Sequence, residues 1–248
     1  MLRSVKKLEH FRILATDSEV GSVTDTYFDD GQWVVRYLIA EAGDWLHDRK
    51  VLISPHAVTS VDWNALAIVT NLSRLQIQDS PSIDTDKPVS RQHESEYLRY
   101  YGYPEYWSSS TYSPWGAMPI VRPVADIPVW GDQQGPTEAM PVPAGDEHLR
   151  SSRHVIGYHI EASDAGIGHV EDFLFDDQSW AIRYAIIDTR NWLPGKHVLL
   201  PPERIRNVNW AERSVFVDMP REAVRSSPAY DPDRSFRKPA PKSPHAPS

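Results

Sequence analysis

Ten histidines are the residues of this 248-residue chain that first suggest chemistry, because imidazole is a common metal ligand. They include His47, His56, His93, His154, His159 and His169. These residues are scattered along the chain, and neither H-x-x-x-H nor H-E-x-x-H, which would place two ligands on one helix face, occurs. We therefore expect surface or capping histidines, no metal site and no cofactor.

Two pairs of neighbouring acids, Asp29–Asp30 and Asp176–Asp177, could serve carboxylate catalysis or hold calcium. Both pairs stand at expected hairpin tips, where aspartates commonly cap turns. Neither belongs to a D-x-D-x-D-G loop with a later glutamate, and the chain has no G-x-S-x-G, P-loop or G-x-G-x-x-G motif. We therefore predict turn residues, no catalytic residue and no enzymatic activity.

An acid and an arginine recur together. Asp25 and Arg36 reappear as Asp172 and Arg183, in each case on strands that we expect to be neighbours. One interpretation is a cross-strand ion pair, which contributes about 0.2–1 kcal/mol. The other makes each arginine an anchor for the carboxylate or phosphate of a ligand. We favour the ion pair, because an arginine beside an opposite charge already has a structural purpose.

The overall charge and the residue types limit the partners. The formal net charge is −8, which disfavours binding to nucleic acid and to anionic lipid. Without any cysteine, disulfides, thiolate metal sites and cysteine nucleophiles are excluded. Neither a signal peptide nor an apolar run of about 18 residues is present. These features predict a cytoplasmic protein without membrane insertion or nucleic-acid binding.

The segments that must position these residues occur twice in the sequence. The phrase FDDGQWVVRYLI begins at Phe28, and FDDQSWAIRYAI begins at Phe175, an offset of 147. The same offset, without a gap, aligns the pairs Asp25/Asp172, Trp33/Trp180, Arg36/Arg183, Trp45/Trp192 and Trp63/Trp210. The chain therefore contains two copies of a unit of roughly 75 residues, too few for a solenoid.

Each copy predicts short strands. Residues 22–28 and 33–39 flank a turn and form a hairpin, whose second strand alternates Trp33, Val35, Tyr37 and Ile39 on one apolar face. Residues 51–55 and 64–71 add strands, whereas 55–63 suit a brief helical turn or loop. An open sheet this short cannot bury both faces. We therefore expect an all-β fold with minor α, in which each copy closes into a small barrel with Trp33 and Trp180 inside.

The predicted domains follow the copies. They are a first barrel at 1–78, an extension with a linker rich in Pro, Ser and Gly at 79–150, a second barrel at 151–225, and an exit segment with a tail at 226–248. A helix is expected at about 90–101, from an N-cap at Ser90 to a stop at Gly102. Its aromatic residues are candidates for partner docking, namely Tyr97, Tyr100, Tyr101 and the nearby Trp107. Alternatively, the helix packs on its own barrel.

The repeated unit resembles the PRC-barrel domain. The likeness lies in a G-x-V-x-D-x-x-F-D opening, in a Gly-Trp connection and in an apolar strand that ends in proline. In the first copy these residues are Gly21, Val23, Asp25, Phe28, Asp29, Tyr37 of an apolar strand, Gly43, Trp45 and Val51 to Pro55. The counterparts in the second copy are Gly168, Val170, Asp172, Phe175, Asp176, Tyr184, Trp192, Pro201 and Pro202. The resemblance implies a small β-barrel used for protein contacts, as in the cytoplasmic part of the bacterial photosynthetic reaction centre H subunit, and no shared catalytic residue.

These observations predict a non-enzymatic interaction, regulatory or adaptor protein built from two such barrels. The partner is either an unidentified protein or the chain itself, through pseudo-two-fold pairing of its barrels. One alternative is an accessory subunit of a photosynthetic or other membrane electron-transfer complex. Another is a small-molecule binder with its site between the barrels.

Overall fold

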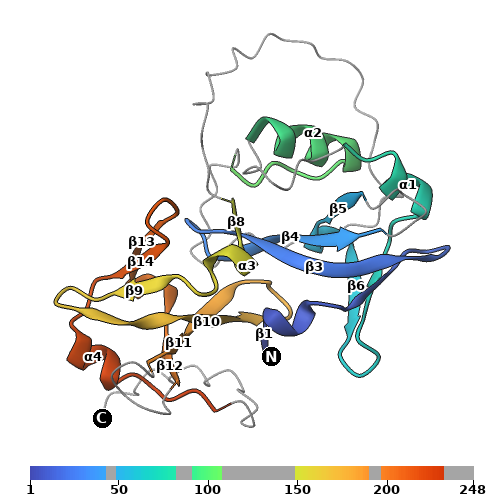
Figure 1. Ribbon diagram of the computed structural model, residues 1–248. Helices are drawn as coiled ribbons and strands as arrows, with labels where there is room; N and C mark the ends of the chain where they lie inside the picture. Colours follow the sequence, from blue (N-terminus) through green and yellow to red (C-terminus); the bar gives the residue numbers. More distant parts are fainter. Residues whose placement is uncertain (43–48, 82–90, 108–148, 190–196, 232–248) are drawn as a thin grey trace, which may run out of the picture. The chain divides into compact units, whose positions relative to one another are not determined.

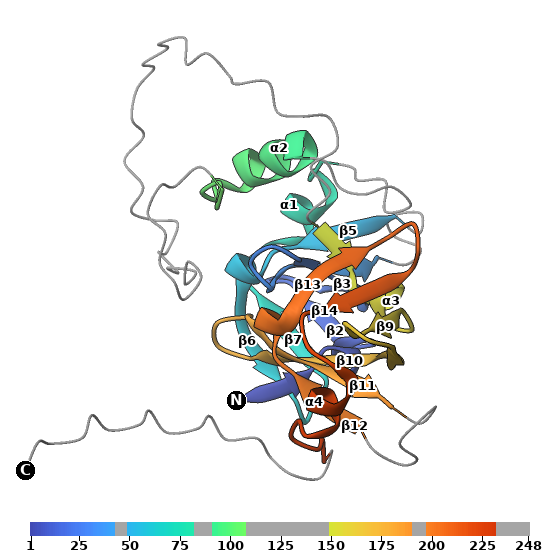
Figure 2. The same cartoon turned by 90° about the vertical axis from the view of Figure 1, so that its left-hand side faces the viewer.

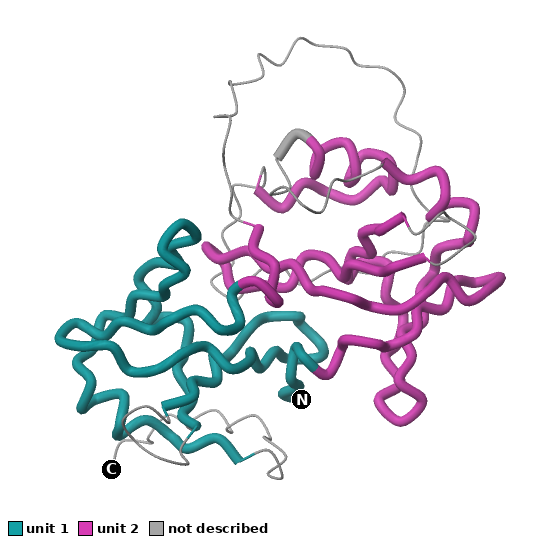
Figure 3. The backbone as a smooth tube through the Cα atoms, viewed as in Figure 1, with its two compact units in different colours: residues 1–6, 155–248 teal, residues 7–154 magenta. Residues whose placement is uncertain are grey.

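The structure is a computed structural model whose described residues are 1–42, 49–81, 91–107, 149–189 and 197–231. They form two compact units, which are coloured separately in Figure 3. Unit 1 consists of residues 1–6 and 155–248, and unit 2 consists of residues 7–154. Each unit is built on one seven-stranded sheet, so the all-β class with minor α is confirmed.

Unit 2 is built mainly from the first copy of the repeat (Figure 1). Its strands are β2 (Arg12–Leu14), β3 (Glu19–Asp29), β4 (Val34–Glu41), β5 (Lys50–Ile53), β6 (Val58–Asp62), β7 (Ala67–Thr70) and β8 (Leu149–Ser151). The sheet order is β5-β4-β3-β2-β7-β6, and β8 pairs with β3. A 3-10 turn at Pro55–Ala57 leads into β6. The sequence predicted the turn but not the strand that follows it.

Unit 1 repeats this topology with the second copy. Its strands are β1 (Leu2–Ser4), β9 (His159–Glu161), β10 (Gly166–Asp176), β11 (Ile182–Asp188), β12 (His197–Leu200), β13 (Ile205–Asn209) and β14 (Ser214–Val217). The order is β12-β11-β10-β9-β14-β13, and β1 pairs with β10. Helix α4 (Arg221–Arg225) and the 3-10 turn at Pro202–Arg204 also belong to unit 1, whereas α3 (Ser152–Val155) and the 3-10 turn at Lys6–Leu8 contain residues of both units. The duplicated sequence therefore forms a duplicated sheet.

Each unit receives one strand from the other copy of the repeat. β1, at the start of the first copy, places Arg3 opposite Phe175 of β10. β8, at the start of the second copy, places Arg150 opposite Phe28 of β3. The domain boundaries predicted from the sequence follow the repeats, whereas the compact units include these exchanged strands.

The repeated hairpin forms as predicted, but its alternation is interrupted. β3 and β4 pair from Ser22 opposite Glu41 to Asp29 opposite Val34, with register shifts after Val23 and Tyr27. Such bulges turn the following side chains to the other face of a strand. Every residue of β4 except Glu41 is buried, so both faces of this strand are covered.

The outer face of the unit 2 sheet is covered by helix α2 (Arg91–Tyr101). Buried Tyr37, Ile39 and Leu52 of the sheet pack in one cluster with Tyr97 and Leu98 of the helix. The prediction that Tyr37 and Ile39 fill the barrel interior is therefore wrong. They pack against the helix instead, because a strand in this sheet has a second apolar face to bury.

Helix α2 occupies the predicted range and ends at Gly102, whose φ of 68° lies in the left-handed region that favours glycine. The predicted N-cap Ser90 lies outside the described residues, as do Gly43, Trp45, His47 and Trp192. The expected linker falls largely within 108–148, which is also outside them. Among the described residues, no helix has the length and apolar character needed to span a membrane.

Candidate functional site

Helix α2 is held against the sheet of unit 2 by a buried carboxylate. Glu94 is 1% exposed, and its Oε1 accepts hydrogen bonds from Tyr37 Oη at 3.0 Å and Tyr106 Oη at 2.7 Å. Burial, together with the nearby Glu94, raises the pKa of Tyr37 well above its usual value, so this phenol stays protonated and donates. The guanidinium of Arg36 lies 3.7 Å from the ring centre of Tyr106. This arrangement orients a helix and offers no exposed reactive group.

Tyr97 holds the same helix to the end of β5. Its Oη donates to the carbonyl oxygen of Leu52 at 3.0 Å and accepts from the N–H of Ser54 at 3.1 Å. Tyr97 is 1% exposed, and its ring lies edge-on to Tyr37 with centroids 5.2 Å apart. Tyr97 is therefore a core residue and is not available to a partner.

Replacing Tyr97 by phenylalanine is expected to destabilise the protein by about 1–2 kcal/mol, because a buried N–H and a buried carbonyl lose their shared hydroxyl. Urea unfolding at neutral pH measures the change. Tyr100→Phe is the matched control, because Tyr100 is 42% exposed and its hydroxyl donates to a carbonyl at the surface. We expect less than about 0.5 kcal/mol for the control. Equal effects of the two substitutions would contradict the docking role of Tyr97.

The other predicted interaction residues lie around the exposed side of α2. Tyr100 is exposed, whereas Tyr101 and Trp107 are partly buried against the helix-covered cluster. The hydroxyls of Tyr100 and Tyr101 both donate to the carbonyl oxygen of Gln76 in helix α1 (Arg74–Gln78), at 3.0 and 3.3 Å. The neighbouring Leu75 is 62% exposed. Figures 1 and 2 show α1 and α2 on the outer side of β5. The exposed side chains of Leu75 and Tyr100 therefore lie on two helices that contact each other, and we call them the α1–α2 surface.

The predicted ion pair between Asp25 and Arg36 is wrong. Asp25 accepts hydrogen bonds from the hydroxyls of Ser151 at 2.6 Å and Ser152 at 3.2 Å, at the start of the second copy. Arg36 instead lies 3.7 Å from the carboxylate of Asp29. The two side chains diverge because a register shift separates Asp25 from the part of β4 that carries Arg36.

The equivalent pair in the second copy behaves in the same way. Asp172 is 6% exposed and accepts hydrogen bonds from the hydroxyl of Ser4 and, at 3.1 Å, from the N–H of Lys6. Arg183 is partly exposed, and its positive charge acts on Asp176 instead, where it helps to lower the pKa of that carboxyl. The repeated aspartates therefore bind the exchanged strands, a role that neither of the sequence interpretations included.

The two repeated tryptophans lie at the hairpin tips, just before their strands. Trp33 and Trp180 have φ angles of 55° and 58°, and their indoles stack on Phe28 and Phe175 at centroid distances of 5.5 and 5.3 Å. Trp180 is 5% exposed, and Trp33 is partly buried. Stacking fixes the indoles over the tip, so the predicted burial is found for Trp180 and only in part for Trp33, and neither residue lies on the strand where the sequence placed it.

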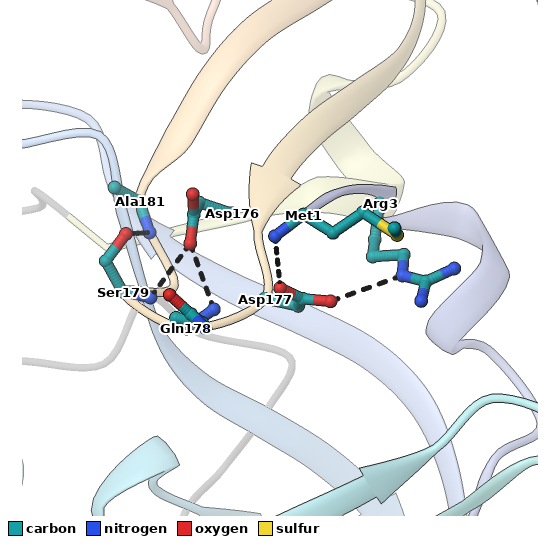
Figure 4. A network of polar contacts seen from close by, with 7 residues as sticks. All are labelled: Met1, Arg3, Asp176, Asp177, Gln178, Ser179 and Ala181. Carbon is teal, nitrogen blue, oxygen red and sulfur yellow. Dashed lines mark hydrogen bonds and ion pairs between the residues drawn. The ribbon is translucent and has the colours of Figure 1, made fainter. Parts of the chain in front are cut away.

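The tip in unit 1 also binds the N-terminal strand, as Figure 4 shows. Asp176 Oδ1 accepts from the N–H groups of Gln178 at 3.0 Å and Ser179 at 3.2 Å, which closes the turn. Asp177 then accepts from the amino group of Met1 at 2.6 Å and from Arg3 Nε at 3.3 Å. The first acid of the pair is the predicted turn residue, whereas the second binds β1.

One cluster in unit 1 has side chains that could bind a metal ion. His169, Glu171 and Asp188 bring their ligand atoms within 4.8 Å of one another, and such a donor set is suited to zinc. Lys6 Nζ, however, lies 2.8 Å from Glu171 Oε1 and already supplies positive charge there. The counterparts in the first copy are Ser22, Thr24 and Glu41. This cluster could not be predicted from the sequence, because its members share no motif spacing and are not repeated.

The corresponding part of unit 2 forms a hollow of about 520 Å³. It is lined by Thr24, Asp25, Tyr27, Ile39, Glu41, Lys50, Arg153 and His154. Its lining includes the acids Asp25 and Glu41 and the bases Lys50 and Arg153, so the hollow suits a small polar molecule better than an apolar one. The sequence does not indicate this hollow, because its lining combines residues of β3, β4 and β5 with residues of α3 more than 100 positions later.

The comparisons with known proteins bear on the repeated units. A family model described as PRC-barrel domain matches the chain twice, at residues 3–73 and 151–224. Together the two matches cover more than half of the 248 residues, and each begins within an exchanged strand. The comparison with curated proteins gives no match.

Proposed function

The chain belongs to the PRC-barrel domain family through both of its repeats, and from this premise we propose that it is a non-enzymatic interaction protein, with an adaptor or regulatory role. The single observation that carries the proposal is the exposed surface of α1 and α2 on unit 2, with Leu75 62% and Tyr100 42% exposed. Aromatic residues are enriched where proteins bind each other. An accessory role in a membrane electron-transfer complex is the version of this proposal in which the partner is an integral membrane protein.

The hydrogen bonds of three carboxylates support a non-enzymatic role. Glu94 orients α2 through two tyrosines, and Asp25 and Asp172 hold the exchanged strands. Each of these carboxylates accepts at least two hydrogen bonds from groups of the chain itself. A general base or nucleophile needs a free lone pair within reach of a substrate, whereas these carboxylates already accept hydrogen bonds that hold the fold together.

A photo-cross-linking amino acid at position 100 tests the proposal in the cells that produce the protein. We expect a defined adduct with one protein, because Tyr100 lies in the proposed contact surface. Leu66 is the matched control position, since it is 51% exposed but lies in the turn between β6 and β7. The identity of the adduct shows whether the partner is a soluble protein, a membrane subunit or a second copy of the chain.

The outcome against the proposal is equally direct. If position 100 gives no adduct, or gives the same scattered adducts as position 66, then the α1–α2 surface does not bind a partner. Cells grown under several conditions belong in the experiment, because a regulatory partner is present only when it is expressed.

The hollow in unit 2 favours a second candidate function, the binding of a small polar metabolite. A ligand that binds only the folded protein adds about 2.7 kcal/mol of stability at 100 times its dissociation constant. A thermal-shift screen against metals, nucleotides and sugars measures this effect, with Glu41→Ala as the variant that should abolish it. An unchanged Tm across the screen would eliminate this candidate.

A further inference from the structure

The two exchanged strands are equivalent in sequence and in place. β1 is Leu2-Arg3-Ser4 and β8 is Leu149-Arg150-Ser151, so both read Leu-Arg-Ser at the offset of the repeat. β1 runs antiparallel to residues 174–176 of β10, and β8 runs antiparallel to residues 27–29 of β3. Either strand therefore fits an acceptor edge of the same construction.

The acceptor edge binds each strand through the same serine and backbone contacts. In unit 2, Asp25 accepts from Ser151 Oγ at 2.6 Å and from the N–H of Arg153 at 3.3 Å. In unit 1, Asp172 accepts from Ser4 Oγ and from the N–H of Lys6 at 3.1 Å. In each unit, one carboxylate therefore binds both the serine hydroxyl and the backbone N–H two residues later.

An arginine completes the recognition in both units. Arg150 Nε donates to Asp30 at 2.6 Å, and both side chains are only 13% exposed. Arg3 Nε donates to Asp177 at 3.3 Å at the equivalent hairpin tip. Charge-assisted hydrogen bonds of this kind are about twice as strong as neutral ones.

We propose that the two repeats bind each other by reciprocal donation of their Leu-Arg-Ser strands, and that this exchange holds them together without help from the chain between them. The recognition mode is strand addition to a sheet edge, with main-chain hydrogen bonds for affinity and Arg and Ser contacts to aspartates for specificity. Each copy of the repeat is then incomplete by itself, because the edge that receives the strand belongs to the other copy.

A specific protease site placed within residues 108–148 of the full-length chain tests this proposal. After cleavage, the N-terminal fragment keeps β1 and the β3 acceptor, and the C-terminal fragment keeps β8 and the β10 acceptor. We expect the cut protein to elute at the position of the uncut chain and to appear in native mass spectrometry as one copy of each fragment. Separation of the fragments at micromolar concentration overturns the proposal, and so does a complex of two copies of each fragment.

Substitutions on the cut protein show whether the strands are responsible. Arg150→Glu places a negative charge against Asp30 on the other fragment, and we expect the dissociation constant to rise at least tenfold. Adding Asp30→Arg restores the pair with reversed charges and should recover much of the affinity. The control is Arg12→Glu, the same change of charge in an ion pair with Glu19 that lies inside one fragment. If Arg150→Glu and Arg12→Glu have equal effects on the dissociation constant, strand exchange does not hold the repeats together.

Discussion

Gly168→Ala is expected to destabilise unit 1 by about 3–5 kcal/mol, the largest effect of any substitution that we predict. A Cβ at this position would lie 1.9 Å from the carbonyl oxygen of Asp188, which is part of the neighbouring strand and cannot move aside. The φ of Gly168 is +142°, a backbone conformation that residues other than glycine rarely adopt. Denaturant unfolding of the full chain, monitored by circular dichroism, measures the loss.

Gly166→Ala is the matched control, two residues earlier on β10. Its Cβ would meet Glu161 Oε2 at 3.5 Å, an ordinary contact with a flexible side chain, so we expect a change within about 0.5 kcal/mol. Gly21 repeats the situation of Gly168 in the first copy, where a Cβ would lie 1.9 Å from the carbonyl oxygen of Glu41. A tolerated Gly168→Ala would mean that the two strands do not approach as the structure shows.

This glycine illustrates what could be predicted from the sequence. Gly21 and Gly168 stood in the repeated G-x-V-x-D-x-x-F-D opening, and the duplication itself predicted two similar β units correctly. The hairpin was also predictable, because β-branched and aromatic residues flank a turn rich in aspartate. The close approach of backbone to backbone was not, because it depends on which residue of the next strand lies opposite.

The strand exchange could not be predicted from periodicity. Strands of three residues, such as Leu2–Ser4 and Leu149–Ser151, are too short to show an alternating pattern. The signal that existed was the identity of Leu-Arg-Ser at the offset of the repeat. Even this identity indicates only that both copies have the strand, since sequence comparison does not say which copy receives it.

The face of helix α2 that packs on the sheet was hard to predict, because it includes a charged residue. Glu94, Tyr97, Leu98 and Tyr101 follow the i, i+3, i+4, i+7 spacing of a single helix face. A glutamate at the start of that row argues for a solvent-exposed face, whereas the structure buries it with Tyr37 and Tyr106 as donors. Residues from two other segments had to be known before the buried face could be distinguished from the exposed one.

Asp172→Ala is expected to destabilise the protein by about 2–4 kcal/mol, because it removes the acceptor for three donors at the edge that receives β1. These donors are Ser4 Oγ, the N–H of Lys6 at 3.1 Å and the N–H of Phe173 at 2.7 Å. Glu171→Ala is the adjacent control. Glu171 pairs with Lys6 at the surface, where both side chains are more than a third exposed, so we expect a loss below about 1 kcal/mol.

The dependence of this loss on pH provides an independent test of the buried carboxylate. Burial raises the pKa of Asp172, although hydrogen bonds from Ser4 and Lys6 oppose the shift. The folded protein then keeps this proton to a higher pH than the unfolded chain, whose aspartates have a pKa of about 3.9. The stability that Asp172 contributes is therefore complete below the unfolded pKa and is partly lost as the pH rises through the folded value. The difference in unfolding free energy between wild type and Asp172→Ala should accordingly be larger near pH ~4 than near pH ~7, and a difference that instead grows toward neutral pH would show that the carboxylate is stabilised in its charged form.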